Sequence, residues 1–358
     1  MYVMIYLYRG SKNKMKKQWL GEKTISDGIS LEILTSKLKL PPLPDNEIKL
    51  LAMAQQQVDN IDIKVFTKLI EMDPGLLTSV LQLANSPYYS SVVKIISLKD
   101  AITRIGLEEA VNSVCFYFFQ KILPKLPVIE GFSSKDSWAY SWACAVANRR
   151  LGHPNLGMGT KPGELYLAGL LHGIGKLLMA IHYPKEFSWC LTKAKYLKQP
   201  LHKLELDIFG TTDAIVSSKL MEIWNLPENT CKGVAFYQMP EDAPKEYKEI
   251  AGLTQLAYHI AAISGIGISG DGTQIDLSSL YICQQANLQI SKKEIRENLV
   301  KKILTSLKKN SESVTGLSSS AKTSVKKDIK IRRSASPPDA SKRKKLGLFA
   351  KIMSMFNR

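Results

Sequence analysis

Residues 168–179 read Ala168-Gly-Leu-Leu-His172-Gly173-Ile-Gly-Lys-Leu-Leu-Met179, an apolar helical stretch with one imidazole in it. The stretch is built like a helix of a metal site, but Gly173 stands where a carboxylate would be needed. A catalytic divalent ion takes three or more protein ligands and leaves one position open for water. Ligands elsewhere in the chain therefore decide whether the protein is a metal-dependent enzyme.

The composition describes a mostly globular protein. The chain has 358 residues, 45% hydrophobic and 8% aromatic, which is enough for one large domain or two of ordinary size. Its five cysteines are widely spread and form no C-x-x-C pair. This spacing argues against a zinc ribbon, a thioredoxin-type site or a disulfide framework, and we expect a reducing cytoplasm.

Positive charge is concentrated near the C-terminus. The formal net charge is +17, and residues 291–358 hold 19 Lys and Arg against 5 Asp and Glu. The remainder of the chain is close to neutral. Basicity therefore informs us about the partners of the tail and not about the chemistry of the body.

Residues 1–30 are expected to form a flexible arm. The apolar run Met1–Tyr8 is too short to span a bilayer, and its lysines follow it instead of preceding it as in a signal peptide. Met15 is as plausible a start as Met1.

Helical spacing of apolar residues recurs along the body, and Pro and Gly mark the corners. Asp45 and Asp73 are placed to cap helices, and Ser97 with Asp100 has the spacing of a capping box, in a helix that Gly106 closes. The longer predicted helices are 31–40, 108–123, 135–151, 164–181, 184–197, 200–224 and 247–264. No alternating strand pattern extends over five residues and no repeat is evident, so the fold class is all-α, a multi-helix bundle.

The C-terminal third contains three predicted segments. Residues 241–309 are expected to add helices that pack on the body. Residues 310–341, rich in Ser, Lys and Pro, are predicted to be a disordered linker. Residues 342–358 are predicted to form an amphipathic helix whose candidate membrane or anion contacts are Lys342, Arg343, Lys344, Lys345, Phe349 and Phe356.

Several motifs in order resemble the HDOD domain, a signalling relative of the HD metal-dependent phosphohydrolases. They are Leu40-Pro-Pro-Leu-Pro44, Asp73-Pro-Gly-Leu76 with Leu81-Gln-Leu-Ala-Asn-Ser-Pro-Tyr-Tyr89, Ile96-Ser-Leu-Lys-Asp-Ala-Ile102 with Ile105-Gly-Leu107, Gly169–Leu177, and Trp224-Asn-Leu-Pro227. Together they imply an HDOD helical domain over residues 31–240. The family-motif or interaction residues carried over are Pro41, Pro42, Asp73, Pro74, Asn85, Ser86, Pro87, Ala101, Gly106, His172, Gly175, Lys176, Trp224 and Pro227.

The resemblance also locates the positions at which relatives keep metal ligands. This chain has Tyr140, Asp213, Tyr237 and Gln238 where histidines are usual, and Gly173 where aspartate is usual. His172 is retained, with Asp213 as a second vestigial ligand. Metal catalysis is not expected from so few ligands, and we predict no catalytic residues, no metal and no cofactor.

Structural explanations exist for the same residues. His172, surrounded by leucines, fits a packed and hydrogen-bonded histidine better than a ligand. Gly173 and Gly175 would permit close approach of helices. For Asp73, Asn85 and Ser86, a binding surface and a role in helix caps and corners stay open as equal alternatives.

The leading hypothesis is a catalytically inert HDOD protein of bacterial signalling whose body binds a signalling protein partner. The first alternative is a degenerate HD-type phosphohydrolase that uses His172, Asp213 and nearby carboxylates such as Glu164 or Asp207. The second is a nucleic-acid-associated regulator that acts through lysines of residues 326–345.

The tail favours a membrane over nucleic acid. Basic residues near an anionic surface each contribute about 1 kcal/mol, and the apolar face of the terminal helix adds burial. The tail lacks interleaved aromatic residues for stacking on bases. We therefore expect a cytoplasmic protein that is peripheral at the inner face of the membrane, and nucleic acid ranks lower as a partner.

Overall fold

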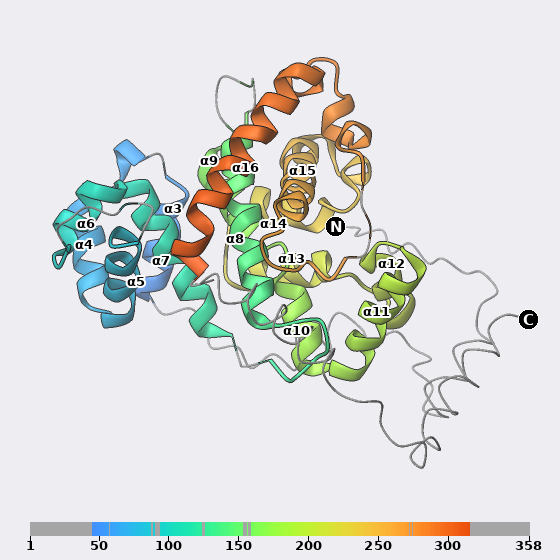
Figure 1. Ribbon diagram of the computed structural model, residues 1–358, viewed down its shortest axis with the longest axis horizontal. Helices are drawn as coiled ribbons and strands as arrows, with labels where there is room; N and C mark the ends of the chain where they lie inside the picture. The colour runs from blue at the N-terminus through green and yellow to red at the C-terminus, as the bar shows by residue number, and fades with distance from the viewer. Residues whose placement is uncertain are drawn as a thin grey trace, which may run out of the picture. The chain divides into compact units, whose positions relative to one another are not determined.

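A computed structural model describes residues 45–315, apart from gaps at 57, 87–88, 90–93, 124–125, 153–155, 157–158, 272 and 274 (Figure 1). The α-helices are α3 (Asp45–Ala54), α4 (Ile63–Glu71), α5 (Pro74–Ala84), α6 (Leu98–Ile105), α7 (Leu107–Ile122), α8 (Ser134–Leu151), α9 (Pro162–Leu171), α10 (Ile174–His182), α11 (Pro184–Leu197), α12 (Leu201–Phe209), α13 (Asp213–Ile223), α14 (Glu228–Phe236), α15 (Lys248–Ser264) and α16 (Lys293–Thr315). The described ranges contain no strand, only one isolated bridge between Ile129 and Phe132. The prediction of an all-α fold is confirmed.

Helices α5 and α6 begin at the caps that the sequence predicts, and α6 ends at Gly106 as expected, whereas Asp45 is the first residue of α3. The Asp73 carboxylate accepts hydrogen bonds from the backbone N–H groups of Gly75 and Leu76, with Pro74 at the first position of α5. The Ser97 hydroxyl accepts a hydrogen bond from the backbone N–H of Asp100 at the start of α6. These contacts satisfy amide groups that would otherwise have no partner in the first helical turn.

The corner between α5 and α6 is held by Asn85. Its side-chain amide donates to the carbonyl oxygens of Leu81 and Ile95, and its side-chain oxygen accepts from the Ile95 amide. Gly106 then separates α6 from α7 with a φ of +86°, which favours glycine.

Helix α8 lies at the centre of the remaining helices and is buried on nearly all sides. It packs closely against α9 and α15 and also contacts α16. A Cβ atom on Gly169 of α9 would lie 2.6 Å from the Cα of Ala145, so glycine permits the close approach of α8 and α9.

The predicted helix 164–181 is interrupted at His172 and Gly173, and this part of the prediction is wrong. The Ser217 hydroxyl, from α13, explains the break. It accepts a hydrogen bond from the Gly175 amide and donates one to the His172 carbonyl oxygen, each at 2.8 Å. A side chain inserted into the backbone ladder is a common cause of a helix kink.

The single helix predicted over 200–224 is also wrong, because α12 and α13 are separate. Gly210 ends α12 with a φ of +70°, and the Thr212 hydroxyl caps α13 by accepting a hydrogen bond from the Ile215 amide. The turn starts a new helix axis at Asp213.

Helix α16 continues past residue 310, where the linker was expected to begin, to Thr315. The Arg150 guanidinium of α8 donates to the Ser306 hydroxyl and joins α16 to the centre. The expected helix 31–40, the arm 1–30 and the amphipathic helix 342–358 lie outside the described residues.

Residues 162–182 form the one run in the described chain that is long and apolar enough to cross a bilayer. Its most apolar window is 89% buried inside the protein. This burial identifies the run as a core element.

We expect Gly175→Ala to destabilise the protein by several kcal/mol, since the new Cβ would lie 2.1 Å from the Asp213 carbonyl oxygen. Gly173→Ala is the matched control, because its Cβ would meet only the Ser141 hydroxyl, at 3.6 Å. Urea unfolding of both variants measures the difference. Equal stability of the two variants would contradict the proposed close contact of α10 with α13.

Candidate functional site

The side chains that the resemblance places at metal-ligand positions converge at the centre of the fold. They are Tyr140 on α8, His172 between α9 and α10, Asp213 at the start of α13, and Tyr237 and Gln238 at the end of α14; together with Lys176 on α10 and Tyr258 on α15 we call them the central cluster. Apart from Gln238, every member of the central cluster is buried. Six helical elements thus contribute to a single polar interior.

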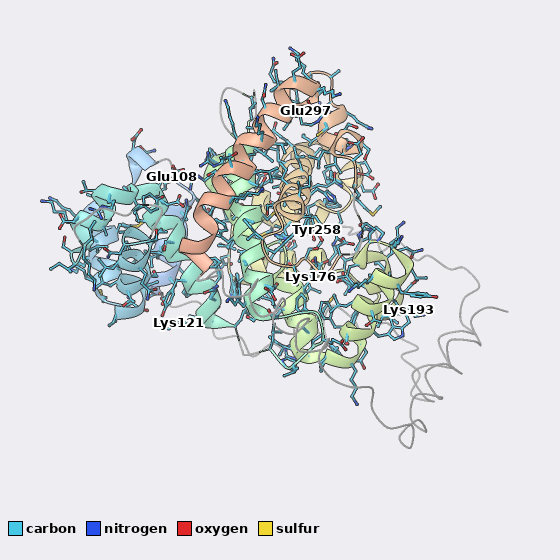
Figure 2. The ribbon with its side chains drawn as sticks, in the orientation of Figure 1. Glu108, Lys121, Lys176, Lys193, Tyr258 and Glu297 are labelled. Carbon is cyan, nitrogen blue, oxygen red and sulfur yellow. The ribbon has the colours of Figure 1, made fainter. Side chains whose placement is uncertain are left out.

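Lys176 and Asp213 form the charged part of the central cluster. The Lys176 ammonium nitrogen lies 3.8 Å from Asp213 Oδ2. The ammonium also donates to the Ser269 carbonyl oxygen at 3.0 Å and lies 5.1 Å from the centroid of the Tyr258 ring (Figure 2 labels Lys176 and Tyr258). Burial opposes the charged ammonium, but the carboxylates of Asp213, Glu205 and Asp271 outweigh it and raise the pKa of Lys176.

Three tyrosines surround His172. The ring centroids of Tyr140, Tyr237 and Tyr258 lie 6.0, 5.4 and 5.5 Å from the imidazole. Burial raises the pKa of each phenol well above its ordinary value, so all three are neutral donors. The rings therefore fill the interior with apolar surface and direct their hydroxyl groups to particular acceptors.

Two tyrosine hydroxyl groups and one side-chain amide have defined acceptors in the central cluster. The Tyr237 hydroxyl lies 3.3 Å from Asp213 Oδ2, and the Gln238 amide donates to Asp213 Oδ1 at 2.6 Å. The Tyr140 hydroxyl donates to the Tyr258 carbonyl oxygen at 2.5 Å. The two residues that replace paired histidines thus serve as hydrogen-bond donors to the carboxylate.

His172 has the role of a packed side chain. Its Nδ1 lies 2.6 Å from the Gly169 carbonyl oxygen, which can only accept, so Nδ1 carries the hydrogen. Burial, reinforced by the Lys176 ammonium, lowers the pKa of His172 to about 4, and the imidazole is neutral.

Glu205 is a member of this site that the sequence did not reveal. It is fully buried on α12, and its Oε2 accepts a hydrogen bond from the Asp213 amide at 2.9 Å. Burial and the adjacent Asp213 carboxylate raise the pKa of Glu205 well above its ordinary value. A helix end at Gly210, which we did not predict from the sequence, would have been the signal, since the turn there directs α12 toward α13.

The two carboxylates named as alternatives lie elsewhere. Glu164 is hydrogen-bonded to Asn229 of α14, and Asp207 is exposed on α12. Neither joins the central cluster in place of Glu205.

Residues beyond 240 also close the central cluster. Asp271 Oδ2 lies 3.2 Å from the Tyr258 hydroxyl, and Asp271 Oδ1 accepts from the Leu201 amide. The same loop approaches α8, where the Ile268 amide donates to the Asp136 carbonyl oxygen. No motif in the sequence pointed to this loop.

The side chains of the central cluster do not fit a divalent metal. In the described part of the chain, no three His, Cys, Asp or Glu residues are grouped so that they could hold one. The ammonium of Lys176 lies 3.8 Å from the Asp213 carboxylate, and a cation bound to Asp213 would meet it as a like charge. The positive charge near Asp213 is supplied by the chain itself.

Most other motif residues have structural positions. Ala101 and Ser86 are buried, Trp224 packs against Phe119 with ring centroids 5.5 Å apart, and Pro227 precedes α14. Pro41, Pro42, Pro87 and the tail contacts Lys342, Arg343, Lys344, Lys345, Phe349 and Phe356 lie outside the described residues. The motif residues therefore do not gather at one site.

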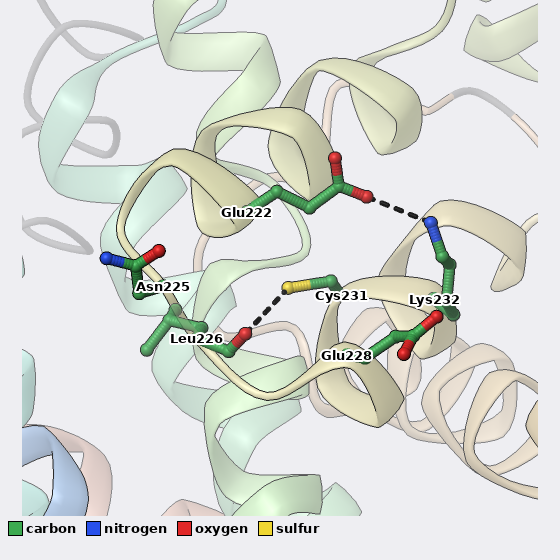
Figure 3. Close-up of a pocket in the computed structure, with 6 residues that line it drawn as sticks. All are labelled: Glu222, Asn225, Leu226, Glu228, Cys231 and Lys232. Atoms are coloured by element: carbon green, nitrogen blue, oxygen red, sulfur yellow. Dashed lines mark hydrogen bonds and ion pairs between the residues drawn. The ribbon is translucent and has the colours of Figure 1, made fainter.

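Two surface hollows of about 370 Å³ border motif segments. The first is lined by Glu222, Asn225, Leu226, Glu228, Cys231 and Lys232, with the Glu222–Lys232 ion pair across it (Figure 3). The second, which we call the α3–α5 cleft, is lined by Asn46, Glu47, Leu50, Leu69, Met72, Asp73, Pro74, Leu76 and Lys121. At the edge of the α3–α5 cleft, the Lys121 ammonium donates a hydrogen bond to Asp73 Oδ2 at 3.0 Å.

Comparison with known proteins gives one curated relative. An uncharacterized protein of Treponema pallidum (strain Nichols) is 25% identical over 253 residues, which are 66% of this chain and 47% of that protein. The chain thus spans about half the length of the curated relative that it matches.

Solved structures share the fold. An HDOD domain protein of unknown function from Geobacter sulfurreducens has a TM-score of 0.65 and 22% identity, covering 79% of this chain and 97% of its own. A candidate phosphohydrolase from Shewanella amazonensis SB2B has a TM-score of 0.61 and 22% identity, and the match covers 81% of this chain and 98% of that protein. A candidate signal transduction protein from Marinobacter aquaeolei VT8 has a TM-score of 0.63 and 21% identity, and the match covers 79% of this chain and 60% of that protein.

The family model of the HDOD domain matches residues 40–240, which agrees with the motifs and with the helical fold. Since this match covers more than half of the 358 residues, the chain belongs to the HDOD domain family.

Proposed function

We propose that the protein is a catalytically inactive HDOD signalling protein whose helical body binds a protein partner. The observation that carries the proposal is the Lys176 ammonium beside Asp213, in a group of side chains that replaces the ligands of a metal site.

Charge balance supports the absence of metal catalysis. Lys176 and Asp213 form a buried ion pair and compensate each other's charge inside the protein. Unit charges of like sign 4 Å apart repel by roughly 4 kcal/mol at the effective dielectric of a protein, and a divalent ion doubles the effect. Binding of a metal at Asp213 would thus require displacement or deprotonation of Lys176.

The α3–α5 cleft supports a role in binding a partner. Met72 at its edge is 62% exposed, and Ile48 of α3 is 47% exposed. Methionine adapts its shape to varied apolar surfaces and is common at binding sites. The cleft also presents the ion pair of Asp73 and Lys121, which can add directional contacts at its rim.

The basic tail is proposed to contact the membrane. Contact of residues 342–358 with an anionic membrane would place the body beside partners at the cytoplasmic face.

We expect the purified full chain to bind no stoichiometric Mn²⁺, Fe²⁺ or Mg²⁺ and to hydrolyse no model phosphodiester. Metal analysis, calorimetric titration with Mn²⁺ and an assay with bis(p-nitrophenyl) phosphate measure this. Stoichiometric metal together with hydrolysis that is lost in both His172→Ala and Asp213→Asn would show a phosphohydrolase instead.

Lys176→Met should lower the free energy of unfolding by about 3–5 kcal/mol, because it leaves the buried Asp213 charge unpaired. Adding Asp213→Asn to this variant should restore much of the loss. The matched control is Lys121→Met, which removes an ion pair whose lysine is 57% exposed and should cost less than about 1 kcal/mol. Urea unfolding measures all variants. A loss as small as that of the control would refute the central role of the ion pair.

Met72→Glu should weaken capture of a partner by the full chain about tenfold or more, since it places a charge on the apolar rim of the α3–α5 cleft. Ile263→Glu, at an exposed position of α15, is the control. Quantitative affinity capture from cells of the source organism, followed by mass spectrometry, compares the two with the unmodified chain. If every protein captured by the unmodified chain is retained equally by Met72→Glu, the cleft is not the partner site.

A further inference from the structure

Helices α11 and α12 pack against each other as a hairpin with an amphipathic outer surface. The inner face of α11 buries Phe187, Cys190, Leu191 and Ala194. The opposite face carries Lys185, Trp189, Lys193 and Tyr196, at the three- and four-residue spacing that places side chains on one side of a helix. We call this outer face, together with Leu197 and the exposed residues of α12, the hairpin surface.

The hairpin surface exposes large apolar side chains. Tyr196 is 63% exposed, Leu197 is 46% exposed and Leu206 of α12 is 47% exposed. Trp189 is partly exposed, and the Lys193 ammonium lies 5.8 Å from the ring centroids of both Trp189 and Tyr196. Tyrosine and tryptophan are enriched where protein meets the boundary between water and hydrocarbon, because their rings are apolar and carry a polar group.

The hairpin surface also carries positive charge. Residues 184–209 contain five lysines, Lys185, Lys193, Lys195, Lys198 and Lys203. They contain three carboxylates, of which Glu205 is fully buried, so only Glu186 and Asp207 oppose the lysines at the surface. Long lysine side chains can lie along an apolar layer and keep their ammonium groups in water. An anionic lipid surface complements this combination of charge and apolar area.

The position of Lys193 favours lipid over nucleic acid. Its ammonium lies 5.8 Å from the ring centroid of Trp189 and 5.8 Å from that of Tyr196 (Figure 2 labels Lys193). The ammonium thus lies over the ring faces that a nucleic-acid base would stack on. The aliphatic side chains of Leu197 and Leu206 offer no base contact, but they add apolar area for a bilayer.

We propose that the hairpin surface is a membrane-contact site that binds the interface of an anionic bilayer, with Trp189, Tyr196 and Leu206 entering the headgroup region. The site is separate from the basic tail and from the central cluster. The hairpin would hold the folded body at the lipid surface, whereas the tail by itself could only tether it.

Quenching of tryptophan fluorescence by brominated lipid tests the proposal on the full chain. The tail has no tryptophan, Trp138, Trp142 and Trp224 are buried, and Trp189 and Trp19 remain. Vesicles of brominated phosphatidylcholine with an equal part of phosphatidylglycerol should quench the emission, and vesicles without phosphatidylglycerol should quench it much less. Trp189→Phe should abolish most of this quenching, and the control Trp19→Phe should leave it unchanged.

A charge variant provides the second measurement. Lys195→Gln with Lys203→Gln should weaken the vesicle partitioning that Trp189 quenching reports by about 30-fold, at roughly fivefold per lysine near an anionic surface. Lys64→Gln with Lys99→Gln, two exposed lysines on other helices, is the matched control and should change it little.

Three outcomes would overturn the proposal. They are equal quenching in Trp189→Phe and the unmodified chain, equal weakening by the two lysine pairs, and a Trp189 response to single-stranded DNA with none to vesicles. Circular dichroism of Trp189→Phe verifies that the variant is folded. None of these outcomes depends on whether the central cluster is inactive.

Discussion

The contact between Gly175 and the backbone of Asp213 determines the arrangement of the whole centre. A Cβ atom at residue 175 would lie 2.1 Å from the Asp213 carbonyl oxygen, so α10 and the start of α13 touch at backbone distance. This approach also brings the Ser217 hydroxyl into the break between α9 and α10. Lys176 follows Gly175, and Asp213 follows the cap residue Thr212. Their side chains are thereby placed 3.8 Å apart in the interior.

A buried charge must be compensated, and the cluster does so within the chain. Moving an ion out of water costs several kcal/mol even in a relaxed protein, so the ammonium and the carboxylate depend on each other. The pKa of Glu205 is raised because a second buried negative charge next to Asp213 would be unfavourable. Tyr237 and Gln238 donate hydrogen bonds to the two oxygens of the Asp213 carboxylate.

The HDOD fold in this chain therefore has two levels. Its centre follows from close contacts and charge compensation, and its periphery carries exposed apolar residues on α3, α4 and the α11–α12 hairpin. Loops and helices beyond residue 240, including Asp271 and Tyr258, close the centre although the family model ends before them. Function at the periphery can vary in such a scaffold without a change in the core.

The sequence by itself determined the all-α class, the family, and the caps at Asp73 and Ser97, because periodicity, proline and capping side chains act over three or four residues. It also identified which ligand positions hold Tyr140, Asp213, Tyr237 and Gln238. Only the tertiary structure decided that the helices predicted over 164–181 and 200–224 are broken. The first break depends on the Ser217 hydroxyl, which comes from another helix. The second is at Gly210, and a single glycine can also occur inside a continuous helix. Lys176, Glu205 and Asp271 likewise meet at the centre through contacts between residues far apart in the chain, and no local pattern encodes the low-dielectric interior that fixes their charges.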